Sequence, residues 1–396
     1  MKQLLACLVG LLAVLQLGGC SSQGKSAPPP ASVQAEAREN GVLVTFPMEE
    51  GVEYWLFYAP SASLTSTNFI SVAGGKVRTG AVSPVLVPLL ENGTTYYFTI
   101  NGRTQGGPGG TGTPLVSATP RLAGGTWSAA AAIPSADLRG TAFGGVFIAV
   151  GANGAMFSSP DGISWTALNF VVASDLNSVS FVNNVYMAVG AGGVLLASTD
   201  AATWTQQTTG TASDLQAVAG NGAGTYVVVG AGGAIIASTG GGGWTAASSG
   251  TSGRLYGASF GNGRFVAVGA GGVALTSADG LSWTAVSSQT NSDLRSVAYS
   301  ASASLFVAVG AAGSLATSPD GITWTARAPI STRTMNAVIA GSQFVAVGNE
   351  GTILTSVDGI AWQAAASGTL VNLFGTAYGN SHYVAAGAAG TNLTAY

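Results

Sequence analysis

A repeating unit occupies the sequence from about residue 126 to the C-terminus. In each copy a glycine ends a valine-rich run, and successive glycines lie 38 to 41 residues apart. Similarity at a fixed period of this length indicates that related supersecondary units pack side by side. The sequence carries seven such glycines: Gly151, Gly190, Gly230, Gly269, Gly310, Gly348 and Gly387.

A single copy shows what each unit builds. Between residues 255 and 284, short β-prone runs are separated by turn-forming residues. The turns at Gly261 to Gly263 and at Asp279-Gly280 supply the positive φ angles that tight hairpins require. We therefore expect four strands in a meander. A period near 40 residues with four strands per unit is typical of a β-propeller.

The two ends of the repeat region complement each other. Six copies end in a tryptophan, but the seventh stops at Tyr396 before reaching one, and the missing residue stands upstream at Trp127. We expect residues 373–396 to supply three strands of the last blade and the segment around Trp127 to supply its outer strand. This pairing would close the ring and remove an open sheet edge. The sequence thus predicts an all-β fold with a seven-bladed, four-stranded-blade propeller over residues 121–396.

The pattern Gly-x-x-Gly-x-x-x-x-Ser/Thr-x-Asp-Gly-x-x-Trp, as in Gly348 to Trp362, resembles the repeats of the photosystem II assembly-factor family of propellers. More broadly, it resembles the Asp-box of sialidase-like propellers. The resemblance covers residues 126–396. It departs at one point, because the Asp-box has a residue between Asp and Gly, whereas Asp358 and Gly359 are adjacent. The resemblance implies an architecture and not a specific activity.

The N-terminus resembles a bacterial lipoprotein signal over residues 1–19. A basic start precedes an apolar run that is too short for a permanent membrane span, followed by Leu17 to Cys20. The resemblance implies that Cys20 is acylated, and Ser21 after it implies sorting to the bacterial outer membrane, on its periplasmic or cell-surface face. The alternative is an ordinary secretory signal with an incidental cysteine. Cys7 would leave with the signal, so no disulfide is expected.

Two segments separate the anchor from the repeats. Residues 20–31 carry Pro28-Pro29-Pro30 and no apolar period, so they read as an extended linker. Residues 32–120 contain strand-like runs and the segment Leu90 to Tyr96, which matches the Leu-x-x-Gly-Thr-x-Tyr run of fibronectin type III domains. That resemblance implies a β-sandwich in which Tyr96 bonds back to the backbone. We expect it to act as a spacer.

Composition excludes several kinds of function. Charged residues make up 7% of the chain and the net charge is −3, which excludes an electrostatic grip on nucleic acid. His382 is the single histidine, and no free thiol is expected, so zinc and haem sites lack ligands. We expect no cofactor, no metal site and a monomer.

Two series of aspartates recur with the repeat. One follows the third strand of a blade and should accept hydrogen bonds from its own turn, which is a structural role rather than a catalytic one. The other precedes a leucine, as in Asp175-Leu176, and we expect it to cap the loop into the innermost strand. The turn series is Asp161, Asp200, Asp279, Asp320 and Asp358.

The residue after that leucine differs from blade to blade, although the repeat around it is strict. These residues begin the innermost strands, on the face where propellers usually bind ligands. Glu350, in a loop that carries Gly or Ala elsewhere, points to the same face. A binding site would show this variation, and so would a solvated rim. The candidates are Arg139, Asn177, Gln216, Tyr256, Arg295, Asn336, Phe374 and Glu350.

Two functions fit these observations. The first is a non-catalytic binding or assembly scaffold, anchored to the membrane by lipid, for an envelope protein or a surface polysaccharide. The second is a glycan-binding or sialidase-like head. Sialidase chemistry needs three arginines, a tyrosine paired with a glutamate, and an acidic aspartate. Arg139, Arg295 and Tyr256 with Glu350 supply part of that set, and Arg254 is a further candidate.

Overall fold

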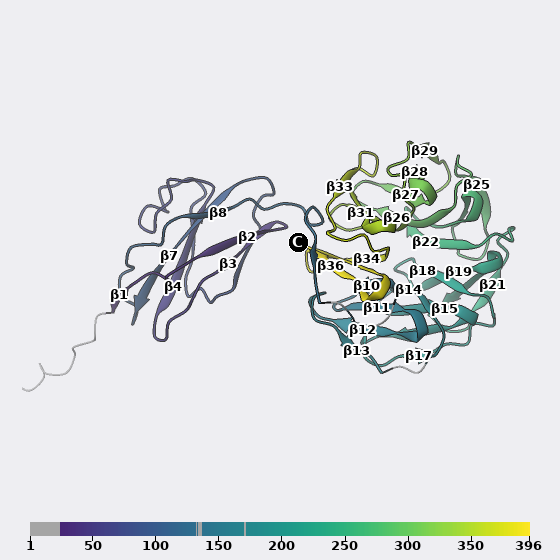
Figure 1. Cartoon of the computed structure of the whole chain (residues 1–396), viewed down its shortest axis with the longest axis horizontal. Coiled ribbons are helices and arrows are strands. Elements are labelled where there is room, and N and C mark those ends of the chain that lie inside the picture. The colour runs from purple at the N-terminus through teal and green to yellow at the C-terminus, as the bar shows by residue number, and fades with distance from the viewer. Residues whose placement is uncertain (1–23, 132, 134–136, 170–171) are drawn as a thin grey trace, which may run out of the picture. The chain divides into compact units, whose positions relative to one another are not determined.

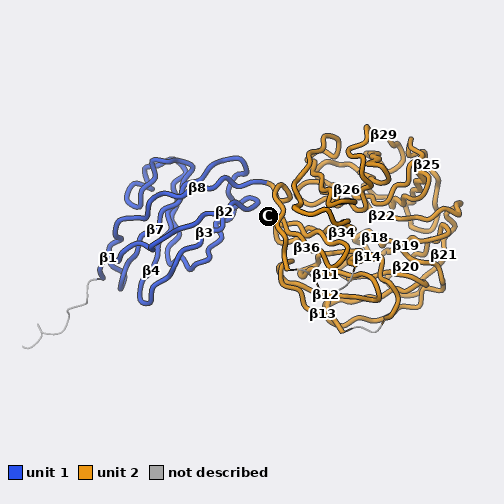
Figure 2. The backbone as a smooth tube through the Cα atoms, in the orientation of Figure 1, with its two compact units in different colours: residues 1–121 blue, residues 122–396 orange. Residues whose placement is uncertain are grey.

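The computed structural model describes residues 24–131, 133, 137–169 and 172–396. The predicted signal and Cys20 lie outside the described residues. The chain divides into two compact units, Met1–Arg121 and Leu122–Tyr396 (Figure 2). In the part of the chain that is described, no helix combines the length and the hydropathy of a membrane span.

Unit 1 is built from two antiparallel sheets. Their facing sides share a core that includes Val42 and Val44 on one sheet and Leu56, Phe98 and Ile100 on the other, all of them buried. One sheet has the order β1 (Lys25–Ala27), β7 (Tyr96–Thr104), β4 (Glu53–Ala59) and β5 (Lys76–Arg78), with β8 (Val116–Ala118) also paired to β7. The other has the order β2 (Gln34–Arg38), β3 (Gly41–Thr45) and β6 (Val85–Pro88).

Part of the segment predicted as a linker, residues 25–27, forms a strand in the structure. β1 pairs with β7, with Lys25 opposite Thr104, and Ala27 is buried. The free edge of β7 explains the difference, because an unpaired row of backbone groups can order a segment that has no apolar period of its own. At the other end of β7, the N–H of Glu91 donates to the hydroxyl of Tyr96 over 3.3 Å. This is the backbone contact predicted for that tyrosine.

Unit 2 contains seven four-stranded antiparallel sheets in the described residues, numbered here in chain order. The first four are β10 (Leu138–Phe143), β11 (Phe147–Gly151), β12 (Met156–Ser159), β13 (Thr166–Ala167); β14 (Leu176–Val182), β15 (Val185–Gly190), β16 (Leu195–Ser198), β17 (Thr205–Gln206); β18 (Leu215–Gly220), β19 (Thr225–Gly230), β20 (Ile235–Thr239), β21 (Thr245–Ala247); and β22 (Leu255–Gly261), β23 (Arg264–Gly269), β24 (Val273–Ser277), β25 (Thr284–Ser287). The last three are β26 (Leu294–Ser300), β27 (Leu305–Gly310), β28 (Leu315–Ser318), β29 (Thr325–Arg327); β30 (Met335–Ala340), β31 (Phe344–Gly348), β32 (Ile353–Ser356), β33 (Gln363–Ala365); and β34 (Leu373–Gly379), β35 (His382–Gly387), β36 (Asn392–Ala395), completed by β9 (Ser128–Ala129).

The sheets form a ring. Neighbouring sheets contact each other through their innermost strands from β10 to β34, and β34 in turn contacts β10. Figure 1 shows β10, β14, β18, β22 and β26 toward the middle of the unit and β13, β17, β21 and β25 at its periphery. In the seventh sheet, Ser128 pairs with Thr394 and Ala129 with Leu393, so the chain closes the ring as predicted.

The second strand of each sheet explains why the sheets need one another. Val266 and Val268 on β23 are fully buried and pack with Phe306 and Ala308 on β27. Ala267, between them, faces the preceding sheet and is buried with Val227 and Val229. A strand buried on both faces loses these contacts in an isolated sheet, and each large aliphatic side chain contributes about 1.5–3 kcal/mol on burial.

Each second strand is followed by a short 3-10 turn whose central residue has a positive φ, as at Asn153 (φ 55). The aspartates before the leucines were expected to cap their own loops, but they accept instead from the turn of the preceding sheet. Asp175 accepts the N–H of Asn153 at 2.8 Å, and Asp137 accepts that of Ala389 at 2.9 Å across the closing junction. In the described residues, the backbone N–H at the centre of each of these two turns has no acceptor within its own sheet. The aspartate side chain at the start of the following sheet therefore accepts it. The turns are η1 (Ala152–Gly154), η2 (Ala191–Gly193), η3 (Ala231–Gly233), η4 (Ala270–Gly272), η5 (Ala311–Gly313), η6 (Asn349–Gly351) and η7 (Ala388–Gly390).

Candidate functional site

Every innermost strand of unit 2 contains a β-bulge near its start. On β10 the pairing with β11 shifts between Leu138 and Gly140, which leaves the residue between them without a partner. A bulge re-aims the side chain of its extra residue, and bulges are frequent beside functional sites. The extra residues are the seven strand-start candidates: Arg139, Asn177, Gln216, Tyr256, Arg295, Asn336 and Phe374.

These seven side chains line one axial cavity of about 730 Å³. All seven innermost strands contribute to its wall, so the cavity lies where the sheets converge. Further along the same strands the lining includes the aromatic residues Phe143, Phe181 and Tyr378. The volume is within the range of ligand sites. The lining is as polar as it is apolar, and most of its polar side chains stand near the starts of the innermost strands.

Glu350 was expected on the same face as these residues, and its turn bonds Asn372, two residues before Phe374. Glu350 is not among the residues that line the axial cavity. Its carboxylate forms an ion pair with Arg333, and both side chains are about half exposed. The N–H of Glu350 donates to Oδ1 of Asn372 at 3.0 Å, which fixes the turn. The nearby cation therefore holds this carboxylate outside the cavity.

Two of the seven side chains serve as bridges between sheets. Nδ2 of Asn177 donates to the carbonyl of Leu215 at 2.9 Å, and Nδ2 of Asn336 donates to that of Leu373 at 2.8 Å. Their Oδ1 atoms accept from Arg139 at 2.9 Å and Arg295 at 2.8 Å. Both asparagines thus hold an arginine beside the cavity. Asn336 also donates to Oδ1 of Asn349 at 2.9 Å, so it keeps less capacity for a ligand than Asn177 does.

The two arginines differ in their charge balance. The guanidinium of Arg139 lies 2.8 Å from Oδ2 of Asp175, whose pKa is lowered first by the N–H of Asn153 and then by this cation. Within the described residues Arg295 has no ion pair, and its side chain is exposed. Arg295 is therefore the cavity cation whose charge no protein carboxylate offsets, with donors to spare for a ligand.

Sequence reasoning missed the threonines of the cavity wall. Thr141 and Thr376 line the cavity and are 8% and 7% exposed, and in the described structure their hydroxyls have no hydrogen-bond partner. Thr141 lies on β10 and Thr376 on β34, the two innermost strands that meet where the ring closes. A polar residue within an otherwise apolar run was the sequence feature that could have indicated them. The aromatic residues at or next to the ends of β10, β14 and β34 also line the cavity, which was not predicted from the sequence.

The residues proposed for sialidase chemistry are not assembled. Arg139, Arg295 and Tyr256 share the cavity, but Arg254 and Glu350 are not part of its lining. Arg254 lies 3.8 Å from Asp214, and Glu350 pairs with Arg333. In the described residues no three His, Cys, Asp or Glu side chains gather as a metal site would require.

The turn aspartates have the structural role that was predicted. Oδ1 of Asp279 accepts from the N–H groups of Ser282 and Leu281, both at 2.8 Å. These bonds, that of Ser282 first, lower the pKa of Asp279 from 3.8 to about 2. The indole N–H of Trp283 donates to the carbonyl of Gly280 at 2.9 Å, which completes the turn. Both residues are occupied by their own loop.

The fold and the axial site define a β-propeller protein. No protein-family model matches the chain, and no curated protein matches it. Among solved structures, "YCF48 bound to D1 peptide" matches with a TM-score of 0.56 and 20% sequence identity, covering 68% of this chain and 96% of that chain. At this identity the likeness shows the fold alone, and it confirms the prediction of a β-propeller.

Proposed function

We propose that this protein is a lipid-anchored bacterial envelope protein whose seven-bladed propeller binds a segment of another protein in its axial cavity and performs no chemistry on it. One observation carries the proposal: seven bulged residues, of five different types, line one cavity. The variation at this repeated position favours a binding site because the side chains share one cavity.

The side chains that remain free suggest how a polypeptide would be held. Gln216 and Tyr256 offer an amide and a hydroxyl to backbone groups, Phe374 offers an apolar surface, and Arg295 offers unused N–H donors. A polypeptide segment carries partners for all four. The solved propeller with a bound D1 peptide supports a protein segment as the occupant, since it shows that this fold can serve that purpose.

The remaining parts of the proposal concern the role of unit 1 and the attachment of the protein to the membrane. We assign unit 1 to the fibronectin type III kind of sandwich, on the strength of its two facing sheets and the Tyr96 contact. It would act as a spacer between the anchor at Cys20 and the propeller, on the outer membrane. Incorporation of labelled palmitate that is lost in Cys20→Ala tests the anchor, and equal labelling of the variant would refute it.

Photo-crosslinking in intact envelopes tests the binding site. A photoreactive phenylalanine analogue at position 374 should capture one protein, and the double variant Gln216→Ala/Tyr256→Ala should reduce the yield. The same analogue at Gln363, which is exposed on the outer strand β33, is the matched control. Equal capture at both positions, or none at position 374, would contradict the axial site.

A glycan-binding or sialidase-like head is the second candidate, because Arg139, Arg295 and Tyr256 share the cavity. A glycan array and a sialoside hydrolysis assay distinguish it from the first. A signal that Arg295→Ala or Tyr256→Phe abolishes would favour this candidate. A surface polysaccharide that binds without being hydrolysed would leave the protein a non-catalytic scaffold and would change only the kind of partner it binds.

A further inference from the structure

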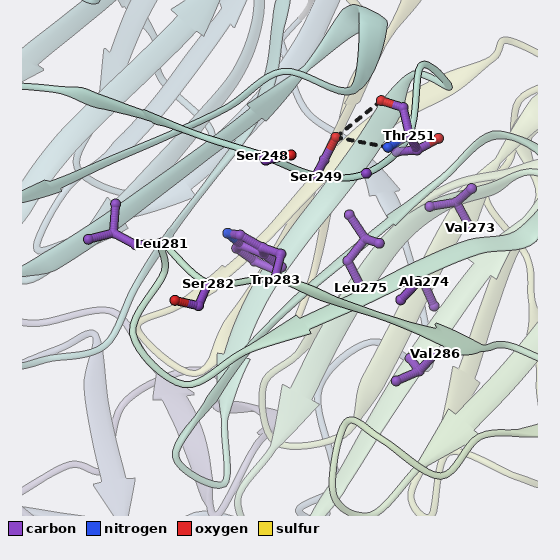
Figure 3. Close-up of a pocket in the computed structure, with 12 residues that line it drawn as sticks. Ser248, Ser249, Thr251, Val273, Ala274, Leu275, Leu281, Ser282, Trp283 and Val286 are labelled. Atoms are coloured by element: carbon purple, nitrogen blue, oxygen red, sulfur yellow. Dashed lines mark hydrogen bonds between the residues drawn. The ribbon is translucent and has the colours of Figure 1, made fainter.

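A second cavity, of about 650 Å³, lies at the periphery of the ring between the third and fourth sheets. Figure 3 shows Ser248, Ser249 and Thr251 on one side of this groove and Trp283 and Leu275 on the other. None of its residues is charged. The rest of the lining is Gly250, Val273, Ala274, Leu281, Ser282, Ala285 and Val286.

The groove borders a free sheet edge. β25 is the outermost strand of the fourth sheet, so its outer N–H and C=O groups have no neighbouring strand in that sheet. It has four residues, whereas the outermost strands β13, β17, β21, β29, β33 and β9 have two or three. Its residues Thr284–Ser287 are uncharged. A longer uncharged edge strand is a template for pairing with another strand.

The fifth sheet shows how such an edge is protected. Three residues after its tryptophan, β29 carries Arg327, whose Nε donates to the hydroxyl of Thr317 at 3.0 Å. The corresponding residue three after Trp283 is Val286. A charged side chain on an edge strand discourages pairing. Among the outermost strands of the described sheets, β29 alone carries such a charge, and β25 is the longest of those that do not.

The lining favours a polypeptide over a sugar. The hydroxyl of Ser249 is bonded within its own loop to Thr251, and that of Ser282 is bonded to Asp279. Apart from hydroxyl groups, the groove offers no amide or charged side chain to bind the hydroxyl groups of a sugar. Leu275 and Ala285 face each other across the β24–β25 pair and form an apolar floor that continues to the free edge.

We infer that β25 and the groove beside it form a second binding site, independent of the axial cavity, for an uncharged extended segment of a partner protein that adds as a fifth strand to the fourth sheet. Backbone hydrogen bonds to β25 would hold the segment. Alternate side chains of an added strand would lie on the same face as Ala285 and extend over the groove. The uncharged lining matches small or aliphatic side chains.

The test uses the full chain and a fluorescent, end-blocked Thr-Val-Thr-Val-Thr-Val peptide. Fluorescence anisotropy should show saturable binding, and hydrogen exchange should slow at the amides of Thr284–Ser287. Val286→Arg should weaken binding about tenfold or more, because it introduces the edge charge of β29. The variant should fold, since Thr276 stands where Thr317 accepts from Arg327. Ala365→Arg, at the equivalent position of β33, is the matched control and should bind as the wild type does.

Three outcomes would overturn the inference. A peptide with N-methylated backbone amides that binds equally well would show that strand pairing is not used. Slower hydrogen exchange at amides outside β25 would place the peptide at another site, and no binding at all would refute the site. A concentration-dependent dimer that Val286→Arg abolishes would assign this edge to a second copy of the chain.

Discussion

Replacing Trp127 by Ala tests how the ring is closed. Trp127 precedes β9, is 7% exposed and packs with Leu393 and Val345. Its indole N–H donates to the carbonyl of Gly124 at 2.8 Å, and its ring centroid lies 6.4 Å from that of Tyr383. This side chain therefore joins the first strand of unit 2 to its last sheet.

The expected cost follows from that burial. Removing a buried tryptophan side chain costs about 3–5 kcal/mol, because its transfer free energy is lost and a cavity remains. The lost indole hydrogen bond accounts for about 1 kcal/mol of this. Seven of the eight tryptophans belong to unit 2, so urea unfolding followed by tryptophan fluorescence reports mainly on this unit.

Trp204→Ala is the matched control. Trp204 is also 7% exposed, and its indole donates to the carbonyl of Ala201 at 3.2 Å. Both variants should lose similar stability, but only Trp127→Ala should speed hydrogen exchange at Leu393 and Thr394, which pair with β9. A loss below about 1 kcal/mol, or no selective change in exchange, would refute the closure argument.

Three further predictions follow from the loops and junctions. Because the folded pKa of Asp279 is about 2 and its ordinary value is 3.8, its bonds stabilise the fold above pH 3.8 and are lost as pH falls through 2. Asp279→Asn should therefore flatten the fall in unfolding free energy between these values, and an unchanged slope would contradict the assignment. Thr334 stands where four of the other six sheets have Asp, so Thr334→Asp, by accepting from the turn η5, should raise the free energy of unfolding by about 1 kcal/mol in urea titrations. An unchanged free energy would contradict the role assigned to these aspartates. Gly379→Ala would place a Cβ 2.1 Å from Cγ of Phe143 and should cost about 1–3 kcal/mol, with Gly125→Ala as a neutral control. Adding Phe143→Ala, which removes the clashing ring atoms, should cost less than the sum of the two single changes.

Features encoded within one repeat were accessible from the sequence. Asp279-Gly280 and Trp283 form their turn from residues within a few positions of each other, and turn chemistry of this kind depends little on the rest of the fold. The closing strand was predictable because the count of tryptophans left one unit incomplete. The residues of the axial cavity were predictable as a varied position in a strict repeat.

Features that join two sheets were not accessible. Asn177 belongs to the same repeat position as Tyr256, yet it bonds the carbonyl of Leu215, 38 residues further along the chain. The sequence offered no means of separating bridging side chains from free ones, nor of seeing that Arg333 holds Glu350 outside the cavity.

The amino-acid sequence by itself determined the repeat, the strands within it and the way the ring closes, because periodicity and turn residues act over a few positions. Only the tertiary structure decided which side chains remain available to a partner and where a free edge borders a groove. Those properties depend on packing between sheets, where partners distant in the sequence come within hydrogen-bonding distance.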